Sequence, residues 1–156
     1  PENEDIYSSE TAYIPKMLDD FFKFAFVREP ADRLISSWKN KVVERNYFNF
    51  SQGELQKYQN LSAFIKWVAA QNIDSCDKHI RSQNSLIDLN ELNFLGRFEN
   101  FNEDFSSLCQ KIGLPYQQIE RRNKSKKIEL NISDNDYELI RKIYLKDYQY
   151  FYPHYL

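Results

Sequence analysis

Glycine and cysteine are scarce in this chain. Only three of its 156 residues are glycines, and the GxxxxGK(S/T) phosphate loop is absent. The two cysteines permit at most one bridge, which excludes a disulfide framework, and they show no metal-ligand spacing with His79 or His154. We therefore expect no metal site, and we interpret both cysteines as reduced thiols of a cytoplasmic protein.

The chain also lacks an excess of charge and a long apolar run. Its formal net charge is −2, so the chain as a whole has no affinity for nucleic acid or anionic lipid. No stretch approaches the roughly 18 consecutive apolar residues of a membrane span. Any anion-binding site must therefore be local, and we expect neither a nucleic-acid partner nor a membrane span.

The composition is that of one ordinary globular domain. Hydrophobic residues make up 42% of the chain and charged residues 28%. The aromatic fraction is high at 16%, which indicates an aromatic core or an aromatic-lined cleft. Residues 1–20 are polar, and Pro15 argues against a continuous helix there, so we expect an irregular leader.

The segment FKFAFVREPADRLISSW places a buried strand directly before a helix. Residues Phe22–Val27 form a short apolar run, and Pro30 suits the first turn of a helix that we expect over residues 30–45. The N–H groups in the first turn of a helix have no intrahelical partner, and the aligned peptide dipoles favour negative charge there. The segment therefore predicts an anion site beside Arg28 and a phosphate-bearing ligand.

The expected helix over residues 30–45 has two chemically different faces at 3.6 residues per turn. Its apolar face consists of Ala31, Leu34, Ile35, Trp38 and Val42. Its polar face consists of Arg33, Ser36, Ser37 and Asn40. Such a helix can pack one face against a core and offer the other to a ligand, so the polar face is a candidate binding surface.

The rest of the chain alternates between helical and strand patterns. The expected elements are helices over residues 61–71 and 101–112, a strand over 93–98, and a last helix that begins at a capping box of Ser133 and Asp136. Residues 47–59 are expected to be a loop with at most one helical turn. Residues 72–90 are expected to be a loop with polar side chains suited to lining a site, namely Asp77, His79, Arg81, Ser82 and Gln83. This order predicts an α/β domain with a parallel sheet, of which two strands are evident.

Residues 24–38, FAFVREPADRLISSW, resemble the 3′-phosphate-binding segment of the sulfotransferases, whose pattern is close to F-V-R-x-P-x-x-R-L-x-S-x-(Y/W). In that family the Arg at the strand end and the later Ser bind the 3′-phosphate of 3′-phosphoadenosine 5′-phosphosulfate (PAPS). The resemblance implies that Arg28 and Ser36 bind this phosphate, and that Arg33 assists them or holds the neighbouring loop.

Further segments are similar to the same family, above all to its carbohydrate branch and bacterial relatives. Residues 93–105, NFLGRFENFNEDF, look like the family's junction IGRFENLxxDF, and residues 144–148 look like its Y-x-x-D-Y element. Asn123 and Ser125 resemble its N-x-S element and are implied to hold the nucleotide. The implied reaction is sulfuryl transfer from PAPS to a hydroxyl acceptor, with carbohydrate favoured.

The fold that this resemblance implies is a P-loop-type parallel sheet flanked by helices. Its phosphosulfate loop, a Pro-Lys segment followed by small residues after the first strand, is not found; the Pro-Lys pair within Tyr13–Met17 lacks those small residues. We therefore expect residues 1–156 to form a single, N-terminally incomplete domain that lacks the first strand and this loop.

Sulfuryl transfer to a hydroxyl needs a group that removes the acceptor's proton. His79 lies in the central part of the chain, and a histidine side chain can accept a proton near neutral pH. We nominate His79 as the general base by hypothesis. Glu44, Asp77 and Glu99 are the next candidates for this role.

Other interpretations of the same residues remain open. In one, Arg28 pairs with a neighbouring carboxylate; the candidates are Glu29, Asp32 and Glu99. The basic segment Arg121–Lys127 is either a solvated loop or a lid over the nucleotide. For the whole chain, the alternatives are a noncatalytic nucleotide- or glycan-binding module and a P-loop kinase relative, whose ATP carries no 3′-phosphate for Arg28 and Ser36 to bind.

Overall fold

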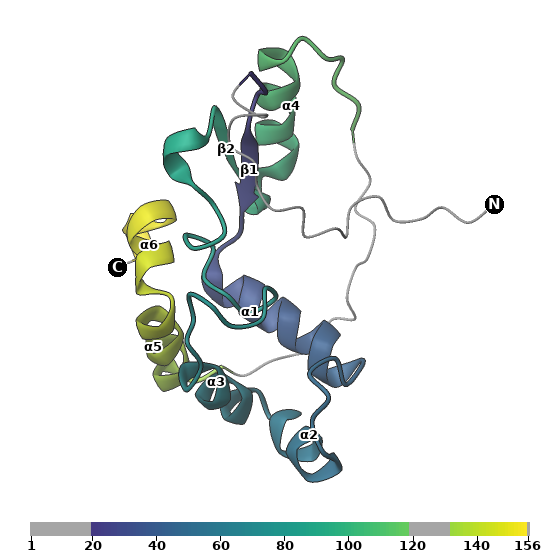
Figure 1. The fold of residues 1–156 in the computed structure, drawn as a ribbon, viewed down its shortest axis with the longest axis vertical. Helices are drawn as coiled ribbons and strands as arrows, with labels where there is room; N and C mark the ends of the chain where they lie inside the picture. The colour runs from purple at the N-terminus through teal and green to yellow at the C-terminus, as the bar shows by residue number, and fades with distance from the viewer. Residues whose placement is uncertain (1–19, 119–131, 156) are drawn as a thin grey trace, which may run out of the picture.

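A computed structural model describes residues 20–118 and 132–155 of the chain. Its elements are, in chain order, β1 (Phe24–Val27), α1 (Pro30–Trp38), the π-helical turn η2 (Lys39–Val43), α2 (Gln52–Tyr58), α3 (Leu61–Ala69), the 3₁₀ turn η3 (Leu89–Glu91), β2 (Phe94–Arg97), the 3₁₀ turn η4 (Phe98–Asn100), α4 (Phe101–Lys111), α5 (Asp134–Ile143), α6 (Leu145–Phe151) and the 3₁₀ turn η5 (Pro153–Tyr155). Figure 1 shows the strands and α4 at the top, α1 in the middle, and α2 and α3 at the bottom. The expected leader over residues 1–20 falls almost entirely outside the described residues.

The two predicted strands pair in parallel, which confirms the α/β class. Phe24 is paired with Phe94, and the register runs to Val27 opposite Arg97. Each strand is shorter than predicted, at four residues. A Cβ on Gly96 would lie 2.4 Å from Cε1 of the Phe26 ring, so the ring occupies the space over this glycine.

The helix predicted after β1 begins at Pro30 and buries its apolar face as expected. Glu29 caps it, since its carboxylate accepts the N–H of Asp32 at 2.7 Å. The α-helical hydrogen-bond pattern ends at Trp38, earlier than predicted, and the chain continues as the π-helical turn η2 to Val43. The wider turn of a π-helix changes the direction in which the following side chains point.

The hydrophobic core lies where α1, α3 and α5 contact one another. Its fully buried side chains from these helices include Leu34, Phe64, Ile65, Val68 and Ile140. Trp38 is 4% exposed and donates its indole N–H to the Tyr58 carbonyl at 2.8 Å, so its predicted place in the core is confirmed. Trp67 is partly buried and packs against this core.

Residues 47–59 contain more helix than the single turn allowed by the prediction, because α2 occupies the second half of this segment. Ser51 accepts the N–H of Glu54 at 3.4 Å, and the Glu54 carboxylate accepts the N–H of Ser51 at 2.9 Å. These contacts form a capping box, which satisfies backbone groups at the start of a helix. The S-x-x-E pattern was present in the sequence and was the missed signal.

The last predicted helix is in fact two, α5 and α6, which meet at Tyr144. This residue has φ −106° and ψ 31°, outside helical geometry. Ser133 does cap α5, accepting the N–H of Asp136 at 3.1 Å. Tyr144 and Tyr148 are buried, whereas Tyr137 is 38% exposed.

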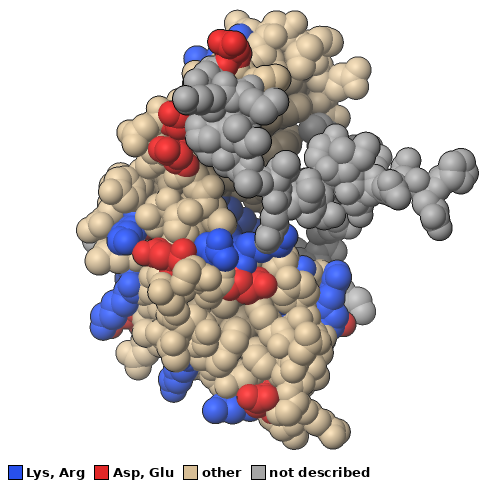
Figure 2. Space-filling model, viewed as in Figure 1, with Lys and Arg blue, Asp and Glu red and all other residues tan. Residues whose placement is uncertain are grey.

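The structure also shows how charged side chains and thiols are distributed over the described residues. On the face shown in Figure 2, basic and acidic side chains are interspersed rather than gathered by sign. Cys76 and Cys109 are both free thiols. In residues 20–118 and 132–155, no helix is long and apolar enough to cross a membrane, and no three His, Cys, Asp or Glu side chains are grouped to hold a metal ion.

Candidate functional site

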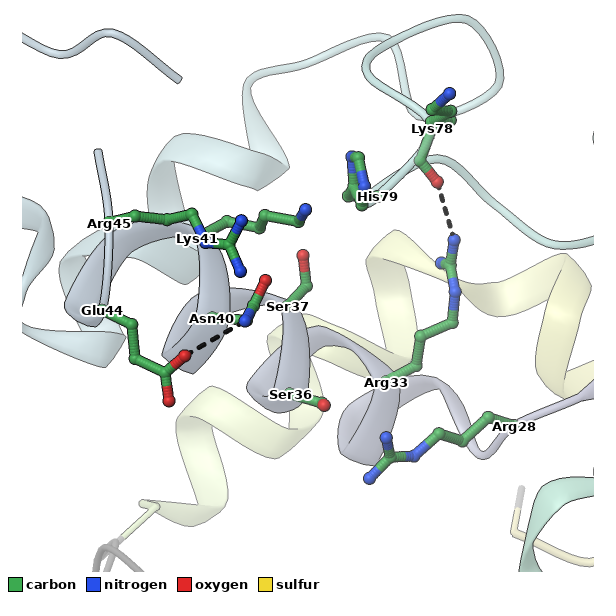
Figure 3. A pocket seen from close by; sticks show the side chains of 10 residues that line it. All are labelled: Arg28, Arg33, Ser36, Ser37, Asn40, Lys41, Glu44, Arg45, Lys78 and His79. Carbon is green, nitrogen blue, oxygen red and sulfur yellow. Dashed lines mark hydrogen bonds between the residues drawn. The ribbon is translucent and has the colours of Figure 1, made fainter. Parts of the chain in front are cut away.

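A pocket runs along the polar face of α1 and continues past η2 (Figure 3). Its volume is about 780 Å³, within the roughly 300–1,000 Å³ of small-ligand sites. The lining side chains come from the end of β1, from α1 and η2, from the residues that follow η2, and from the loop between α3 and β2: Arg28, Arg33, Ser36, Ser37, Asn40, Lys41, Glu44, Arg45, Lys78 and His79. The predicted polar face is therefore the wall of a pocket.

The lining of this pocket is cationic. Five of its side chains are Lys or Arg, and Glu44 supplies the single carboxylate. That carboxylate accepts a hydrogen bond from Asn40 Nδ2 at 3.1 Å, drawn as a dashed line in Figure 3. Because the positive charges outnumber the negative one, the pocket attracts an anionic ligand even though the whole chain is slightly acidic.

Arg28 follows the last residue of β1, and Gln83 fixes its backbone. The Arg28 N–H donates to Gln83 Oε1 at 2.9 Å, and Gln83 Nε2 donates to the Arg28 carbonyl at 2.8 Å. The guanidinium Cζ lies 5.1 Å from the centroid of the Phe98 ring. In Figure 3 this side chain extends beside α1 on the side where Ser36 lies, so the structure brings the two predicted phosphate ligands to one pocket.

Two of the three carboxylates suggested as partners of Arg28 have other partners. Glu29 accepts hydrogen bonds from the N–H of Asp32 and from the Tyr148 hydroxyl. Glu99 accepts the N–H of Glu29 at 2.8 Å. Within the described ranges no carboxylate forms an ion pair with Arg28. The alternative in which this arginine pairs with a neighbouring acid is therefore not what the structure shows.

The backbone at the start of α1 differs from the sequence-based expectation. The N–H groups of Arg28, Glu29 and Asp32 each donate to a side-chain oxygen of the protein. The prediction of an anion site built from free N–H groups was therefore wrong for these three. An anion in the pocket would be bound by side chains instead.

Arg33 holds the loop that carries His79. Its Nη1 donates to the Arg81 carbonyl at 2.7 Å, and its Nη2 donates to the Lys78 carbonyl at 2.9 Å. A guanidinium has five N–H donors, so others remain for a ligand. Burial lowers the pKa of Arg33 from its ordinary value, yet an arginine remains charged at neutral pH. The resemblance implied that Arg33 either assists phosphate binding or holds the neighbouring loop. These hydrogen bonds show the second role.

Two residues of the Y-x-x-D-Y element fix the same loop from its other side. The Asp147 carboxylate is fully buried and accepts the N–H groups of Gln83 and Asn84, both at 2.8 Å. The Tyr144 hydroxyl donates to the Ile80 carbonyl at 2.7 Å. Burial raises the pKa of Asp147, and the two N–H donors oppose that rise. The loop is therefore held between α1 and the α5–α6 pair.

His79 reaches the pocket from this loop. Its Nδ1 lies 2.9 Å from Asp77 Oδ1, and its ring packs edge-on against Tyr47 with centroids 4.7 Å apart. The proposed base thus lines the same pocket as Arg28 and Ser36. Of the fallback candidates, Glu44 also lines it, whereas Glu99 bonds to the backbone before α1.

Sequence reasoning missed part of the pocket and misplaced part of the loop. Lys41, Arg45 and Lys78 line the pocket without having been singled out, although Lys78 is next to His79 in the chain. Ser82 and Gln83, expected to line a site, are buried instead: Ser82 bonds within the loop to Asp74, and Gln83 bonds to Arg28 and Asp147. Asn123 and Ser125, and the basic segment that contains them, lie outside the described residues.

Comparison with known proteins agrees with the resemblance drawn from the motifs. The family model described as "Sulfotransferase family" matches residues 3–153. The chain belongs to this family. One similar relative is carbohydrate sulfotransferase 14 of Danio rerio, 24% identical over 116 residues, which cover 63% of this chain and 32% of the relative. The chain thus spans about a third of that sulfotransferase's length, and no solved structure matches it.

Proposed function

We propose that this sulfotransferase-family protein transfers a sulfuryl group from PAPS to an acceptor hydroxyl, with carbohydrate as the favoured acceptor. Family membership supports the type of reaction. The name of the relative, a carbohydrate sulfotransferase, supports the acceptor class. In this proposal β1 and β2 are two strands of a P-loop-type parallel sheet.

The observation that carries the proposal is the shared position of Arg28 and Ser36. Both line one cationic pocket, and in the described part of the chain Arg28 has no carboxylate partner. An arginine without an acidic partner in a pocket is available to a phosphate, to which a guanidinium can donate two parallel hydrogen bonds. These two residues would hold the 3′-phosphate of the donor.

The pocket is compatible with a nucleotide of this kind in volume and in charge. Its volume of about 780 Å³ is in the range of ligand-sized sites. Lys41, Arg45 and Lys78 supply further positive charge along the same wall. Bound PAPS would contribute the sulfuryl group that is transferred; Arg28 and Ser36 would orient its nucleotide.

The chain's own proton acceptor in this proposal is His79. As the acceptor oxygen forms its bond to sulfur, the bond from sulfur to the 5′-phosphate oxygen breaks, and its electron pair leaves with adenosine 3′,5′-bisphosphate. The hydroxyl proton moves to His79. Such a reaction depends on alignment of the reacting atoms and on positive charge near the leaving oxygen.

Binding measurements separate this proposal from the kinase alternative. We expect adenosine 3′,5′-bisphosphate to bind more tightly than ATP in calorimetric titrations, because only the former carries a 3′-phosphate. Arg28→Ala should weaken bisphosphate binding about 10- to 100-fold, since a hydrogen bond to a charged group contributes about 1.5–3 kcal/mol. Arg141→Ala, an exposed arginine on α5, is the matched control and should leave the affinity unchanged.

Two results would contradict the assignment of the nucleotide. One is tighter binding of ATP than of the bisphosphate. The other is an Arg28→Ala variant that binds both nucleotides like the wild type. If the bisphosphate binds as expected but no labelled sulfate moves from PAPS to glycan acceptors, the noncatalytic binding module is the better interpretation.

A further inference from the structure

Asp77 and His79 form a pair in which one carboxylate oxygen takes two hydrogen bonds. Asp77 Oδ1 accepts the backbone N–H of His79 at 2.9 Å and lies 2.9 Å from Nδ1 of the same residue. Asp77 Oδ2 accepts the Tyr47 hydroxyl at 3.3 Å. The carboxylate is therefore surrounded by donors, and the imidazole ring is bound at its Nδ1 edge.

The chemistry of the two groups decides which ring nitrogen carries the proton. Burial by itself raises the pKa of Asp77, but the hydrogen bonds from His79 and Tyr47 outweigh it and hold that pKa below its ordinary value. An ionised carboxylate only accepts hydrogen bonds, so Nδ1 must donate. A neutral imidazole with its proton on Nδ1 has an unprotonated Nε2.

The other groups around this ring leave Nε2 available. The ring packs edge-on against Tyr47, and Lys41 Nζ lies over the Tyr47 ring at 4.4 Å from its centroid. Lys78 precedes His79 on the loop, and Arg33 approaches that loop from α1. Lys41, Lys78 and Arg33 are cations, and Asp77 is the anion among these charged neighbours. Among the described residues no hydrogen-bond partner of Nε2 occurs, while His79 lines the pocket.

We infer that Asp77 is a positioning residue, which holds His79 with its proton on Nδ1 and so leaves Nε2 free to accept a proton within the pocket. This inference rests on the proposed function for its catalytic consequence. When the acceptor oxygen bonds to sulfur, its proton passes to Nε2, and the imidazolium then donates from both nitrogens. The negative charge of Asp77 stabilises that imidazolium, as an orienting carboxylate does beside other histidine bases.

If Asp77 served only to form the turn, two of its side-chain hydrogen bonds would remain unexplained. The Asp77 carbonyl accepts the N–H of Ile80 at 3.0 Å and the N–H of Arg81 at 2.8 Å, so this residue opens a turn. The bond from the His79 N–H to Oδ1 belongs to the same turn. The turn does not require the bond to Nδ1 or the bond from Tyr47. Those two contacts concern the ring and the charge state of the carboxylate.

The protonation of the ring is measurable by nitrogen-15 NMR without any substrate. The chain has two histidines, so His154, outside the pocket lining, serves as an internal reference. In the neutral ring of His79 we expect the proton on Nδ1. Asp77→Asn keeps an oxygen for the turn but offers an amide that can also donate to Nδ1, so the tautomer ratio of His79 should shift while that of His154 stays fixed. A wild-type ring protonated on Nε2 would overturn the inference even if the variant does not fold.

Steady-state kinetics test the catalytic consequence separately from binding. In Asp77→Asn we expect kcat to fall at least about tenfold, given the roughly 10²–10⁴-fold contribution of general base catalysis. The affinity for adenosine 3′,5′-bisphosphate should be unchanged. Asp74→Asn is the matched control, because Asp74 lies on the same loop and bonds to Ser82 and Lys146 rather than to His79.

The outcomes distinguish this inference from the proposed function. Full kcat in Asp77→Asn, or an equal loss in Asp74→Asn, contradicts the positioning role and leaves sulfuryl transfer intact. Absence of sulfuryl transfer in the wild type contradicts the proposed function. In that case the tautomer of His79, read from the spectra, still decides whether Asp77 sets the protonation of the ring.

Discussion

The side-chain amide of Gln83 pairs with both backbone polar groups of Arg28, at 2.9 Å and 2.8 Å, across 55 positions of sequence. The Gln83 side chain thus forms with Arg28, just beyond the end of β1, the pair of hydrogen bonds that a neighbouring strand would form. Gln83 is itself fixed, because its N–H donates to the buried carboxylate of Asp147. A chain of hydrogen bonds therefore runs from α6 through the loop to the arginine that we propose as a phosphate ligand.

Gln83→Ala should lower both stability and nucleotide affinity. The substitution leaves the Arg28 N–H and carbonyl without their partners, and each unsatisfied buried group costs about 1–3 kcal/mol. Because the same groups fix the start of the Arg28 side chain, binding of adenosine 3′,5′-bisphosphate should weaken as well. Urea unfolding and calorimetric titration measure the two effects.

The matched control for this variant is Gln71→Ala. Gln71 is half-buried, whereas Gln83 is buried, but Gln71 likewise donates from Nε2 to a backbone carbonyl, which is that of Trp67 at 3.1 Å rather than that of Arg28. We expect a loss of stability of about 1 kcal/mol and no loss of nucleotide affinity. If both variants weaken binding equally, the effect is one of global stability and Gln83 has no special link to Arg28.

The features that follow from local patterns were predictable from the sequence. The polar face of the helix expected over residues 30–45 follows from helical periodicity, and all four side chains assigned to it line the pocket, three from α1 and Asn40 from η2. The parallel pairing of β1 and β2 follows from the alternation of elements along the chain. Arg28, Ser36 and His79 were singled out by spacing, family resemblance and residue type.

The features that depend on long-range partners were not predictable. The backbone N–H groups before α1 looked free because Gln83 and Glu99, which accept two of them, lie 55 and 70 positions away. Gln83 itself looked like a ligand-facing residue, since its burial depends on Asp147 in another helix. Local propensity carries no information about such contacts.

Gly96→Ala should destabilise the sheet on which Arg28 depends. A Cβ at this position would lie 2.4 Å from the Phe26 ring, which is packed against Phe94 and Phe101 at centroid distances of 6.1 Å and 5.0 Å. The ring must therefore move, and overpacking of this kind costs typically about 1–3 kcal/mol. Thermal or urea unfolding measures the loss.

Gly53→Ala is the control for the glycine substitution. A Cβ on Gly53 would meet no atom within 4 Å, and the residue lies in α2, where alanine is the better helix former. We expect this variant to be as stable as the wild type or slightly more so. A Gly96→Ala variant of unchanged stability would show that the Phe26 ring has room to move, contrary to the packing seen here.

Asp74→Asn should lower stability in a way that depends on pH. The Asp74 carboxylate accepts the Ser82 hydroxyl at 2.6 Å and pairs with Lys146 Nζ at 2.9 Å. These contacts, that of Ser82 first, hold the pKa of Asp74 below its ordinary 3.8. A carboxyl whose pKa is depressed by folding contributes stability above its unfolded pKa and loses it as the pH falls through the folded value.

The wild type should therefore be more stable than Asp74→Asn at neutral pH, and the difference should shrink as the pH falls below 3.8. We expect at most about 1 kcal/mol at neutral pH, because the pair is largely exposed to solvent. Urea unfolding of both proteins at neutral and acidic pH measures the difference, and added salt should reduce the part due to Lys146. A difference that persists unchanged at acidic pH would mean that the Asp74 side chain stabilises the loop through its shape and hydrogen-bonding capacity rather than through its charge.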